Sequence, residues 1–314
     1  MDLGISVVIP VYNEAESLRE LQRELALALE QTGRSWEILY VDDGSRDGSD
    51  RVIAELASAD RRVRGLSFRR NFGKSAALAV GFRVARGAWV ITMDADLQAD
   101  PSELPKLIAA LEEGYDLVSG WKTQRRDPIT KTLPSRLFNT VTSWVVGIRL
   151  HDYNCGFKLY RREVVESIEV YGELHRFVPA LAHWRGFRVG EVGVHHRPRR
   201  YGRSKFGAAR FVNGFLDLLS AAFLSSSALK PLHLFGRIGL LFLFLGLALG
   251  VYFVVLWIGG EPIHVRPLML FGAGLVLLGI QLILMGLLGE MIARLGVSRT
   301  DYPVRERYNL DANA

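Results

Sequence analysis

Apolar and polar residues in the N-terminal part of the chain follow two alternating periods. Short apolar runs, typical of buried strands, lie at 5–10, 36–41, 63–68, 88–93 and 115–118. Segments with the spacing of amphipathic helices separate them and lie at 14–31, 48–59, 74–86 and after Pro101. Strands that alternate with helices predict an α/β fold with a parallel sheet covered on both faces. In such a fold, ligands bind beyond the carboxyl ends of the strands.

The middle of the chain has a weaker pattern. An amphipathic helix is expected at 135–146 and an edge strand at 187–194, where polar and apolar residues alternate. At 211–223, phenylalanine and leucine recur at helical spacing near basic residues. This segment is expected to lie in a membrane interface, although a helix packed on the protein core has the same pattern.

Two long stretches, 238–258 and 267–289, contain no charged residue. Each is long enough to cross a hydrocarbon core of about 30 Å as a helix. We therefore interpret them as a transmembrane hairpin rather than as two buried core helices. Lys230 and Arg237 precede the hairpin, and four arginines follow it. Positive residues favour the cytoplasmic side and no secretory leader is recognisable, so we expect the N-terminal region and both ends of the hairpin to be cytoplasmic.

Composition narrows the class of partner. The chain has 314 residues, a formal net charge of +6 and a single cysteine, Cys155. One cysteine excludes an intramolecular disulfide and fits a reducing compartment. With two membrane spans present, the positive charge favours an anionic membrane surface and phosphorylated substrates, and no nucleic-acid partner is expected.

The most informative motif is Asp-Ala-Asp-Leu-Gln at 94–98, directly after an apolar run. Two carboxylates and an amide oxygen at the end of a strand are hard ligands, which suit Mg²⁺ or Mn²⁺. Mg²⁺ in particular is usually bound by few protein ligands and by substrate phosphates. The motif therefore predicts a divalent-cation site at Asp94, Asp96 and the neighbouring Gln98 amide.

Two further motifs precede this one, namely Val-Ile-Pro-Val-Tyr-Asn-Glu at 8–14 and Val-Asp-Asp-Gly-Ser-Arg-Asp-Gly-Ser at 41–49. In this order, the three resemble the nucleotide-sugar site of family 2 inverting glycosyltransferases with a GT-A fold. The run Asn-Cys-Gly-Phe-Lys at 154–158 and the two spans resemble the polyprenyl-phosphate members of that family. Those members include dolichyl-phosphate mannose synthases and bacterial undecaprenyl-phosphate glucosyltransferases. The resemblance of the soluble part covers about residues 4–230.

The resemblance implies roles for individual residues. The set expected to bind the nucleotide sugar is Pro10, Tyr12, Glu14, Asp42, Asp43, Asn71, Gly73, Lys74 and Asp94. Asp43 is expected to accept a hydrogen bond from the base, whereas Asp42 fits a turn or helix cap equally well, because Asp-Asp-Gly-Ser is common in turns. The turn at 71–74 is expected to present a lysine and backbone N–H groups to anionic oxygens. Asp96 and Gln98 are expected to hold the metal ion, and Asp94 is expected to support the ribose or the surroundings of the metal. The ion would neutralise charge on the leaving diphosphate.

A polyprenyl phosphate acceptor would change what catalysis requires. A phosphate monoester has a second pKa of about 6, so its oxygen is mostly anionic at neutral pH and a general base contributes little. Asp152 matches the family's position for that base, but it also fits the orientation of an arginine or lysine. Cations are needed to hold two anionic substrates together, and the candidates are Lys122, Arg125, Arg126, Arg136, Arg200, Arg203 and Lys205.

The basic run at 200–205 resembles a mobile loop over the acceptor phosphate, and it also suits attraction to anionic lipid. The residues expected to act in the reaction itself are Asp94, Arg136, Asp152, Arg200 and Lys205.

We therefore predict a membrane-bound inverting glycosyltransferase that transfers a sugar, with UDP-glucose favoured as donor, to undecaprenyl or another polyprenyl phosphate. The reaction is expected at the cytoplasmic leaflet of the cell inner membrane. The expected divisions are a GT-A domain at 1–205, a juxtamembrane region at 206–232, two transmembrane helices at 233–292 and a cytoplasmic tail at 293–314. The alternatives are a GDP-mannose-dependent mannose synthase, a polysaccharide synthase and a non-catalytic scaffold. Four glycines in the first span leave a homo-oligomer open.

Overall fold

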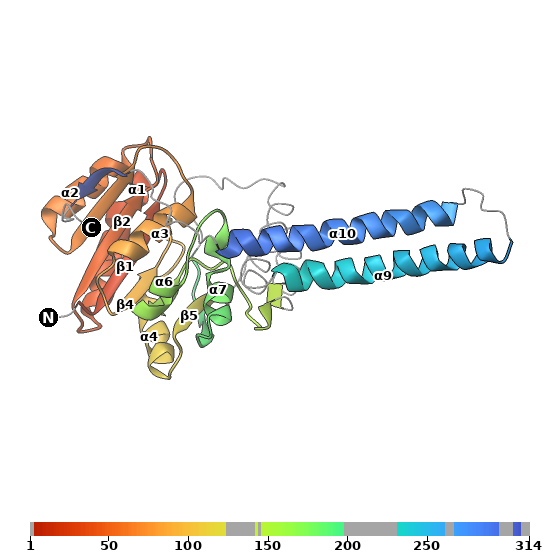
Figure 1. The fold of residues 1–314 in the computed structure, drawn as a ribbon. Coiled ribbons are helices and arrows are strands. Elements are labelled where there is room, and N and C mark those ends of the chain that lie inside the picture. The colour runs from red at the N-terminus through yellow and green to blue at the C-terminus, as the bar shows by residue number, and fades with distance from the viewer. Residues whose placement is uncertain are drawn as a thin grey trace. The chain divides into compact units, whose positions relative to one another are not determined.

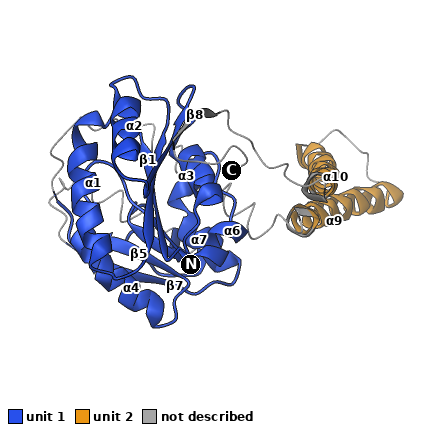
Figure 2. Ribbon diagram, turned by 90° about the vertical axis from the view of Figure 1, so that its left-hand side faces the viewer, with its two compact units in different colours: residues 1–221, 301–314 blue, residues 222–300 orange. Residues whose placement is uncertain are grey.

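The computed structural model describes residues 3–123, 142–143, 146–197, 231–260, 267–294 and 304–308. The chain divides into two units, which Figure 2 draws in different colours. The first comprises residues 1–221 and 301–314, and the second comprises residues 222–300. Part of the expected C-terminal tail therefore belongs to the unit formed by the N-terminal region.

The described part of the first unit contains an eight-stranded sheet in the order β7-β5-β6-β4-β1-β2-β3-β8. Its strands are β1 (Ile5–Val11), β2 (Trp36–Asp42), β3 (Val63–Phe68), β4 (Trp89–Thr92), β5 (Leu117–Lys122), β6 (Lys158–Arg161), β7 (Val189–Val194) and β8 (Val304–Tyr308). Its helices are α1 (Ala15–Glu30), α2 (Ser49–Ala59), α3 (Lys74–Val84), α4 (Leu104–Glu112), α6 (Arg162–Ser167) and α7 (Val178–Trp184), with 3₁₀ turns η1 (Pro101–Glu103) and η2 (Leu174–Arg176). The helices α1, α2 and α4 cover one face of the sheet, and α3, α6 and α7 cover the other (Figures 1 and 2).

The sheet is mixed, whereas the sequence pattern predicted a parallel one. Strands β4, β1, β2 and β3 are parallel to one another, as expected. Between β4 and β5, however, lies β6, which is antiparallel to both. β5 ends at Lys122 and β6 begins only at Lys158. Hydrophobic periodicity does not show that β6 lies between β4 and β5 in the sheet. The expected edge strand is confirmed as β7, which pairs in parallel with β5 alone.

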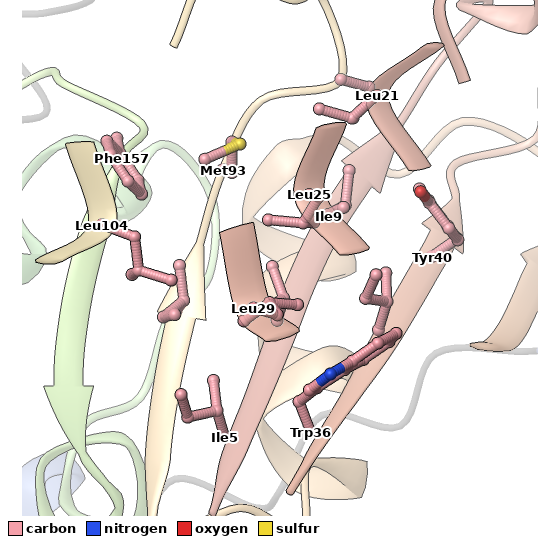
Figure 3. Close-up of a cluster of buried hydrophobic side chains, with 14 of the residues drawn as sticks. Ile5, Ile9, Leu21, Leu25, Leu29, Trp36, Tyr40, Met93, Leu104 and Phe157 are labelled. Atoms are coloured by element: carbon pink, nitrogen blue, oxygen red, sulfur yellow. The ribbon is translucent and has the colours of Figure 1, made fainter. Parts of the chain in front are cut away.

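The main core lies between α1 and the sheet. Leucines at 18, 21, 25 and 29 form one face of α1 and are all buried, because this spacing places them on a single helical stripe. Figure 3 shows Leu21, Leu25 and Leu29 next to Ile5 and Ile9 of β1. Burial of each leucine contributes roughly 1.5–3 kcal/mol. This packing fixes α1 against the central strands.

The edge strand β8 comes from the C-terminal tail and was not among the predicted strands. It pairs antiparallel with β3, and Gly65 lies opposite Tyr308. Its sequence, Val-Arg-Glu-Arg-Tyr, has three charged residues in the middle. Charged residues are common on edge strands because they discourage pairing with other chains, and they also removed the apolar signal on which the prediction relied.

The second unit contains two helices, α9 (Pro231–Ile258) and α10 (Pro267–Arg294). By length and composition, the spans Phe235–Ile258 and Pro267–Gly289 are long and apolar enough to cross a membrane, and only 11% of the most apolar window of each is buried. The low burial contradicts the alternative of two core helices. A β-carbon on Gly239 would lie 2.7 Å from the carbonyl oxygen of Gly279, and one on Gly246 would lie 2.7 Å from that of Gly272. Glycine therefore allows the two backbones to approach closely.

Candidate functional site

The carboxyl ends of β1, β2 and β4 bring the three sequence motifs to one edge of the sheet. Val11 pairs in register with Asp42, and Val8 pairs with Thr92. The backbone N–H of Asp43 donates to the carbonyl oxygen of Val11 at 2.8 Å. The three motifs therefore follow neighbouring parallel strands at the edge where α/β proteins bind ligands.

Asp94 has lysine side chains around it. Its Oδ1 accepts a charged hydrogen bond from Nζ of Lys74, the first residue of α3. Burial acts to raise the pKa of Asp94, but the charges of Lys74, Lys158 and Lys122 outweigh it, so the pKa lies below its ordinary value. Asp94 is consequently ionised at neutral pH. The structure thus pairs two predicted site residues, Asp94 and Lys74, and the charge of a third, Lys122, also acts on Asp94.

Asp96 and Gln98 form a tight turn after β4. Asp96 is 7% exposed, and its Oδ1 accepts a hydrogen bond from the backbone N–H of Gln98 at 3.2 Å. Between them, the buried Leu97 has a φ of 58°. A left-handed conformation costs a residue with a side chain about 1–3 kcal/mol, so the surrounding packing must hold this turn in shape.

The oxygen atoms of this turn fit a divalent ion. Among the described residues, no group of three or more His, Cys, Asp and Glu side chains could hold a metal on its own. Asp96 and Gln98 would supply two hard oxygen ligands and leave the remaining positions to a diphosphate and water, as Mg²⁺ sites commonly do. Both residues stay predicted ligands.

Asp42 and Asp43 have different hydrogen-bond partners. Asp42 accepts from the backbone N–H of Ser45 at 3.1 Å and from the hydroxyl of Ser67 at 2.7 Å, so it closes the turn after β2. Asp43 accepts from the backbone N–H groups of Phe72 at 2.7 Å and Gly73 at 2.9 Å. Burial is the largest influence on Asp43 and raises its pKa, although these two hydrogen bonds act in the opposite direction. Recognition of the base by Asp43 stays a prediction, which would use lone pairs that these bonds leave open.

The turn at 71–74 differs from the expectation in one respect. The backbone N–H groups of Phe72 and Gly73 donate to Asp43 and are not available to an anionic substrate. Gly73 has a φ of 96°, a conformation that favours glycine. The candidates that this turn still offers to a substrate are the exposed Asn71 and the Lys74 ammonium.

The loop that carries Tyr12 and Glu14 is fixed by serines of the 41–49 motif. The backbone N–H of Asn13 donates to Oγ of Ser45 at 2.8 Å, and that of Glu14 donates to Oγ of Ser49 at 3.1 Å. Both serines therefore hold the loop after β1 in position. Tyr12 and Glu14 are half-buried beside this contact. Their role in the nucleotide site stays a prediction.

Asp152 shapes the loop that leads into β6. It is 5% exposed, and its Oδ1 accepts a hydrogen bond from the backbone N–H of Asn154 at 3.0 Å. Burial lowers the pKa of the nearby Lys158, and the charges of Asp152 and Asp94 partly oppose this effect. Asp152 is thus close enough to influence the lysine electrostatically. Its role as a base or as an orienting group stays a prediction.

Several predicted site residues lie outside the residues that the structure describes. They are Arg125, Arg126, Arg136, Arg200, Arg203 and Lys205, together with the expected interfacial segment at 211–223. Arg197, the last described residue before the basic run, contacts the protein itself. Its guanidinium group forms ion pairs with Glu24 at 2.6 Å and Asp100 at 2.9 Å.

A pocket lies next to Asp94, and only some of its lining residues belong to the sequence motifs. Its lining includes Pro10, Lys74, Asp94, Asn154, Lys158 and His175. Nζ of Lys158 donates to the carbonyl oxygen of Cys155. Cys155 is buried, and burial raises the pKa of its thiol, as is usual for a packed cysteine rather than a nucleophile. His175 belongs to none of the sequence motifs. Its partner Ser75 precedes it by 100 residues, so no local pattern connects the two.

The fold and the site together define a class of protein. Its members are enzymes with an α/β fold that binds nucleotide sugars and with an acidic motif after β4. The sequence model "Glycosyl transferase family 2" matches residues 6–169, and the model "GtrB C-terminal hairpin" matches residues 230–295. The chain therefore belongs to glycosyl transferase family 2, and it carries a membrane-type helical hairpin. The predicted family, GT-A fold and glycosyltransferase class are confirmed.

Relatives match the chain over nearly its whole length. The dodecaprenyl-phosphate galacturonate synthase of Rhizobium johnstonii is 37% identical over 309 residues, which cover 93% of this chain and 88% of that protein. The undecaprenyl-phosphate 4-deoxy-4-formamido-L-arabinose transferase of Pseudomonas paraeruginosa is 38% identical over 312 residues, which cover 98% and 89%.

A solved structure supports the fold. Glucosyl-3-phosphoglycerate synthase from Mycobacterium tuberculosis, in complex with Mn²⁺, uridine-diphosphate-glucose and phosphoglyceric acid, superimposes with a TM-score of 0.57 and 20% identity. The match covers 73% of this chain and 82% of that one.

Proposed function

We propose that this protein transfers a sugar from a nucleoside-diphosphate sugar to a polyprenyl phosphate at the cytoplasmic face of the cell inner membrane. The observation that carries the proposal is that relatives named for polyprenyl-phosphate substrates match both units of the chain, the catalytic domain and the hairpin, at 37% and 38% identity. The acidic motif next to Lys74 supports it, because a diphosphate donor requires both a metal site and nearby cations.

In the proposed reaction, an oxygen of the lipid phosphate attacks the anomeric carbon of the donor. The bond from that carbon to the diphosphate breaks, the nucleoside diphosphate leaves, and the configuration at the carbon inverts. A divalent ion, Mg²⁺ or Mn²⁺, would neutralise charge on the diphosphate when bound by Asp96 and Gln98. Because a phosphate monoester loses its second proton at about pH 6, Asp152 need not remove a proton. It would instead orient a cation toward the acceptor.

Four sugars are candidates for the group that is transferred. UDP-glucose is the donor that the resemblance favours, and GDP-mannose is its alternative. The relatives, by their names, add galacturonate and 4-deoxy-4-formamido-L-arabinose as candidate sugars. Each would approach the pocket next to Asp94, whose lining combines lysine, asparagine and histidine side chains.

A donor screen tests the proposal. Purified full-length protein in lipid nanodiscs would receive undecaprenyl phosphate, Mg²⁺ or Mn²⁺, and one labelled donor at a time, namely UDP-glucose, UDP-galacturonate, UDP-4-deoxy-4-formamido-L-arabinose or GDP-mannose. We expect label in the lipid fraction from one donor, and its loss with EDTA and in Asp96→Asn. Glu166→Gln, an exposed acid on α6, should retain activity. Nucleotide binding without transfer from any donor would argue against the polyprenyl acceptor and favour a scaffold or another acceptor.

A further inference from the structure

His175 lies in the pocket next to Asp94, yet the proposed reaction assigns it no role. It belongs to the short turn η2, which packs against α3. The pocket also contains the side chains of Lys74, Asp94, Asn154 and Lys158. An imidazole ring in this position is polar, half-buried and close to groups expected to meet the donor.

Ser75 holds the ring of His175 in one orientation. Oγ of Ser75 accepts a hydrogen bond from the backbone N–H of His175 at 3.1 Å and lies 3.0 Å from its Nδ1. Ser75 is 1% exposed, so its hydroxyl proton needs a protein acceptor. Within the described part of the chain, Nδ1 of His175 lies at hydrogen-bond distance and can accept this proton.

This contact fixes the tautomer of His175. If Nδ1 accepts the serine proton, the neutral ring carries its own proton on Nε2. Burial, followed by the charges of Lys74 and Arg176, moves the pKa of His175 well below its ordinary value. The ring is therefore neutral at pH 7 and presents an N–H donor at Nε2.

The charged groups of the pocket have partners within the protein. Lys74 is paired with Asp94, and Lys158 donates to the carbonyl oxygen of Cys155. The predicted metal ligands Asp96 and Gln98 are not among the residues that line the pocket. A diphosphate would thus lie at the turn after β4, and the pocket would receive a different part of the donor.

We infer that Nε2–H of His175 donates a hydrogen bond to an oxygen of the donor's glycosyl group. A neutral N–H suits the hydroxyl oxygens of a sugar, and Asn154 in the same pocket offers an amide of similar chemistry. Ser75 is then a positioning residue, because it directs the protonated nitrogen away from itself. This inference depends on the proposed transfer from a nucleoside-diphosphate sugar.

Two substitutions separate this role from a structural one. In His175→Asn, the amide takes the place of Nδ1, so the contact with Ser75 is retained and the Nε2–H donor is lost. In His175→Gln, the amide nitrogen takes the place of Nε2, so the donor is retained. His183→Asn on α7, outside the pocket, is the matched control. Calorimetry on the full-length protein with Mn²⁺ would compare UDP with UDP-glucose and UDP-galacturonate, and transfer rates would be measured alongside.

We expect His175→Asn to weaken UDP-sugar binding about threefold to tenfold, which is the effect of one neutral hydrogen bond. UDP affinity and melting temperature should be unchanged, and His175→Gln should lie closer to the unsubstituted protein. The inference is overturned if His175→Asn keeps full affinity for UDP-sugars and a full transfer rate. It is also overturned if the substitution weakens the binding of UDP and of UDP-sugars equally, or if His175→Asn binds UDP-sugars more tightly than His175→Gln. An unsubstituted protein that binds no UDP, no GDP and none of the four donor sugars of the screen would overturn the proposed function itself, and the inference with it.

Discussion

Gly156 lies so close to Asp94 that a β-carbon at this position would stand 2.5 Å from Oδ2 and 2.7 Å from Oδ1. The loop cannot easily retreat, because the carbonyl oxygen of Gly156 accepts a hydrogen bond from Oγ1 of Thr92 at 2.8 Å. The Asn-Cys-Gly-Phe-Lys motif therefore contains glycine for lack of space and not for backbone freedom. It places the loop before β6 directly against the carboxylate that pairs with Lys74.

Gly156→Ala should displace the Asp94 carboxylate and disturb its ion pair with Lys74. We expect transfer to fall by roughly tenfold to a hundredfold, because misplacement of a reacting group by about 1 Å has effects of this size. The fold should survive, with a stability loss of about 1–3 kcal/mol from overpacking. Transfer rate and melting temperature would be measured together. Gly274→Ala, whose added β-carbon meets nothing within 4 Å, serves as the control, and equal rates for both variants would contradict the prediction.

Arg197 fixes the beginning of the basic segment to the loop that carries the predicted metal ligands. Its backbone N–H donates to the carbonyl oxygen of Gln98 at 2.8 Å, and its guanidinium group contacts Glu24 and Asp100. Arg197→Gln should lower the free energy of unfolding by about 1.5–3 kcal/mol, the size of a charge-assisted hydrogen bond. Arg162→Gln, which removes an exposed pair with Glu166, should cost at most about 1 kcal/mol. Denaturant unfolding of the two variants would test the difference.

The contribution of Arg197 should also depend on pH. Burial acts to raise the pKa of Asp100, but hydrogen bonds from Ser102 and Arg197 lower it below its ordinary value. A carboxyl group with a lowered pKa in the folded state stabilises the fold above its unfolded pKa of about 3.9 and loses this effect as the pH falls further. The stability difference between Arg197→Gln and the unsubstituted protein should therefore shrink below about pH 4. A difference that grows on acidification would contradict the assignment.

The order and type of the central elements could be predicted because each depends on local pattern. Buried strands such as Val63–Phe68 and the leucine stripe of α1 carry their periodicity in the sequence itself. The positions of β6 and β8 could not be predicted, because they depend on pairing between segments far apart in the chain. Because such long-range pairing is not visible in local sequence, the pattern predicts a parallel sheet, whereas the structure has a mixed one.

The residues of the site likewise divide into those that local sequence predicts and those that it does not. The acidic motif and Lys74 follow strand ends and could be placed from sequence alone. The partners of Asp43 could not, since its hydrogen bonds join it to the backbone of a turn 29 and 30 residues away. Those bonds occupy N–H groups that the sequence motif predicts for the substrate. His175 carried no local signal at all, and only the fold places it opposite Ser75.

A buried ion pair at the far end of β2 should support stability without affecting catalysis. Arg64 donates to Glu37 at 2.6 Å, and their side chains are only 4% and 5% exposed. Glu37 is the second residue of β2, at the opposite end from Asp42. Arg64→Met should cost about 3–5 kcal/mol, because it leaves a buried carboxylate without its counter-charge. The double variant Arg64→Met with Glu37→Gln should recover part of this loss, and folded fractions of both should transfer sugar at the unsubstituted rate.

The hairpin offers a prediction that is independent of the active site. A β-carbon on Gly246 would lie 2.7 Å from the carbonyl oxygen of Gly272, whereas one on Gly250 meets nothing within 4 Å. Both glycines belong to α9, so Gly246→Val and Gly250→Val change helix propensity and hydrophobicity equally. Only Gly246→Val should force the backbones of α9 and α10 apart, at a cost of about 1–3 kcal/mol. Circular dichroism melts in nanodiscs should show a lower melting temperature for Gly246→Val alone. Equal melting temperatures for the two variants would mean that close glycine contact does not hold this hairpin together.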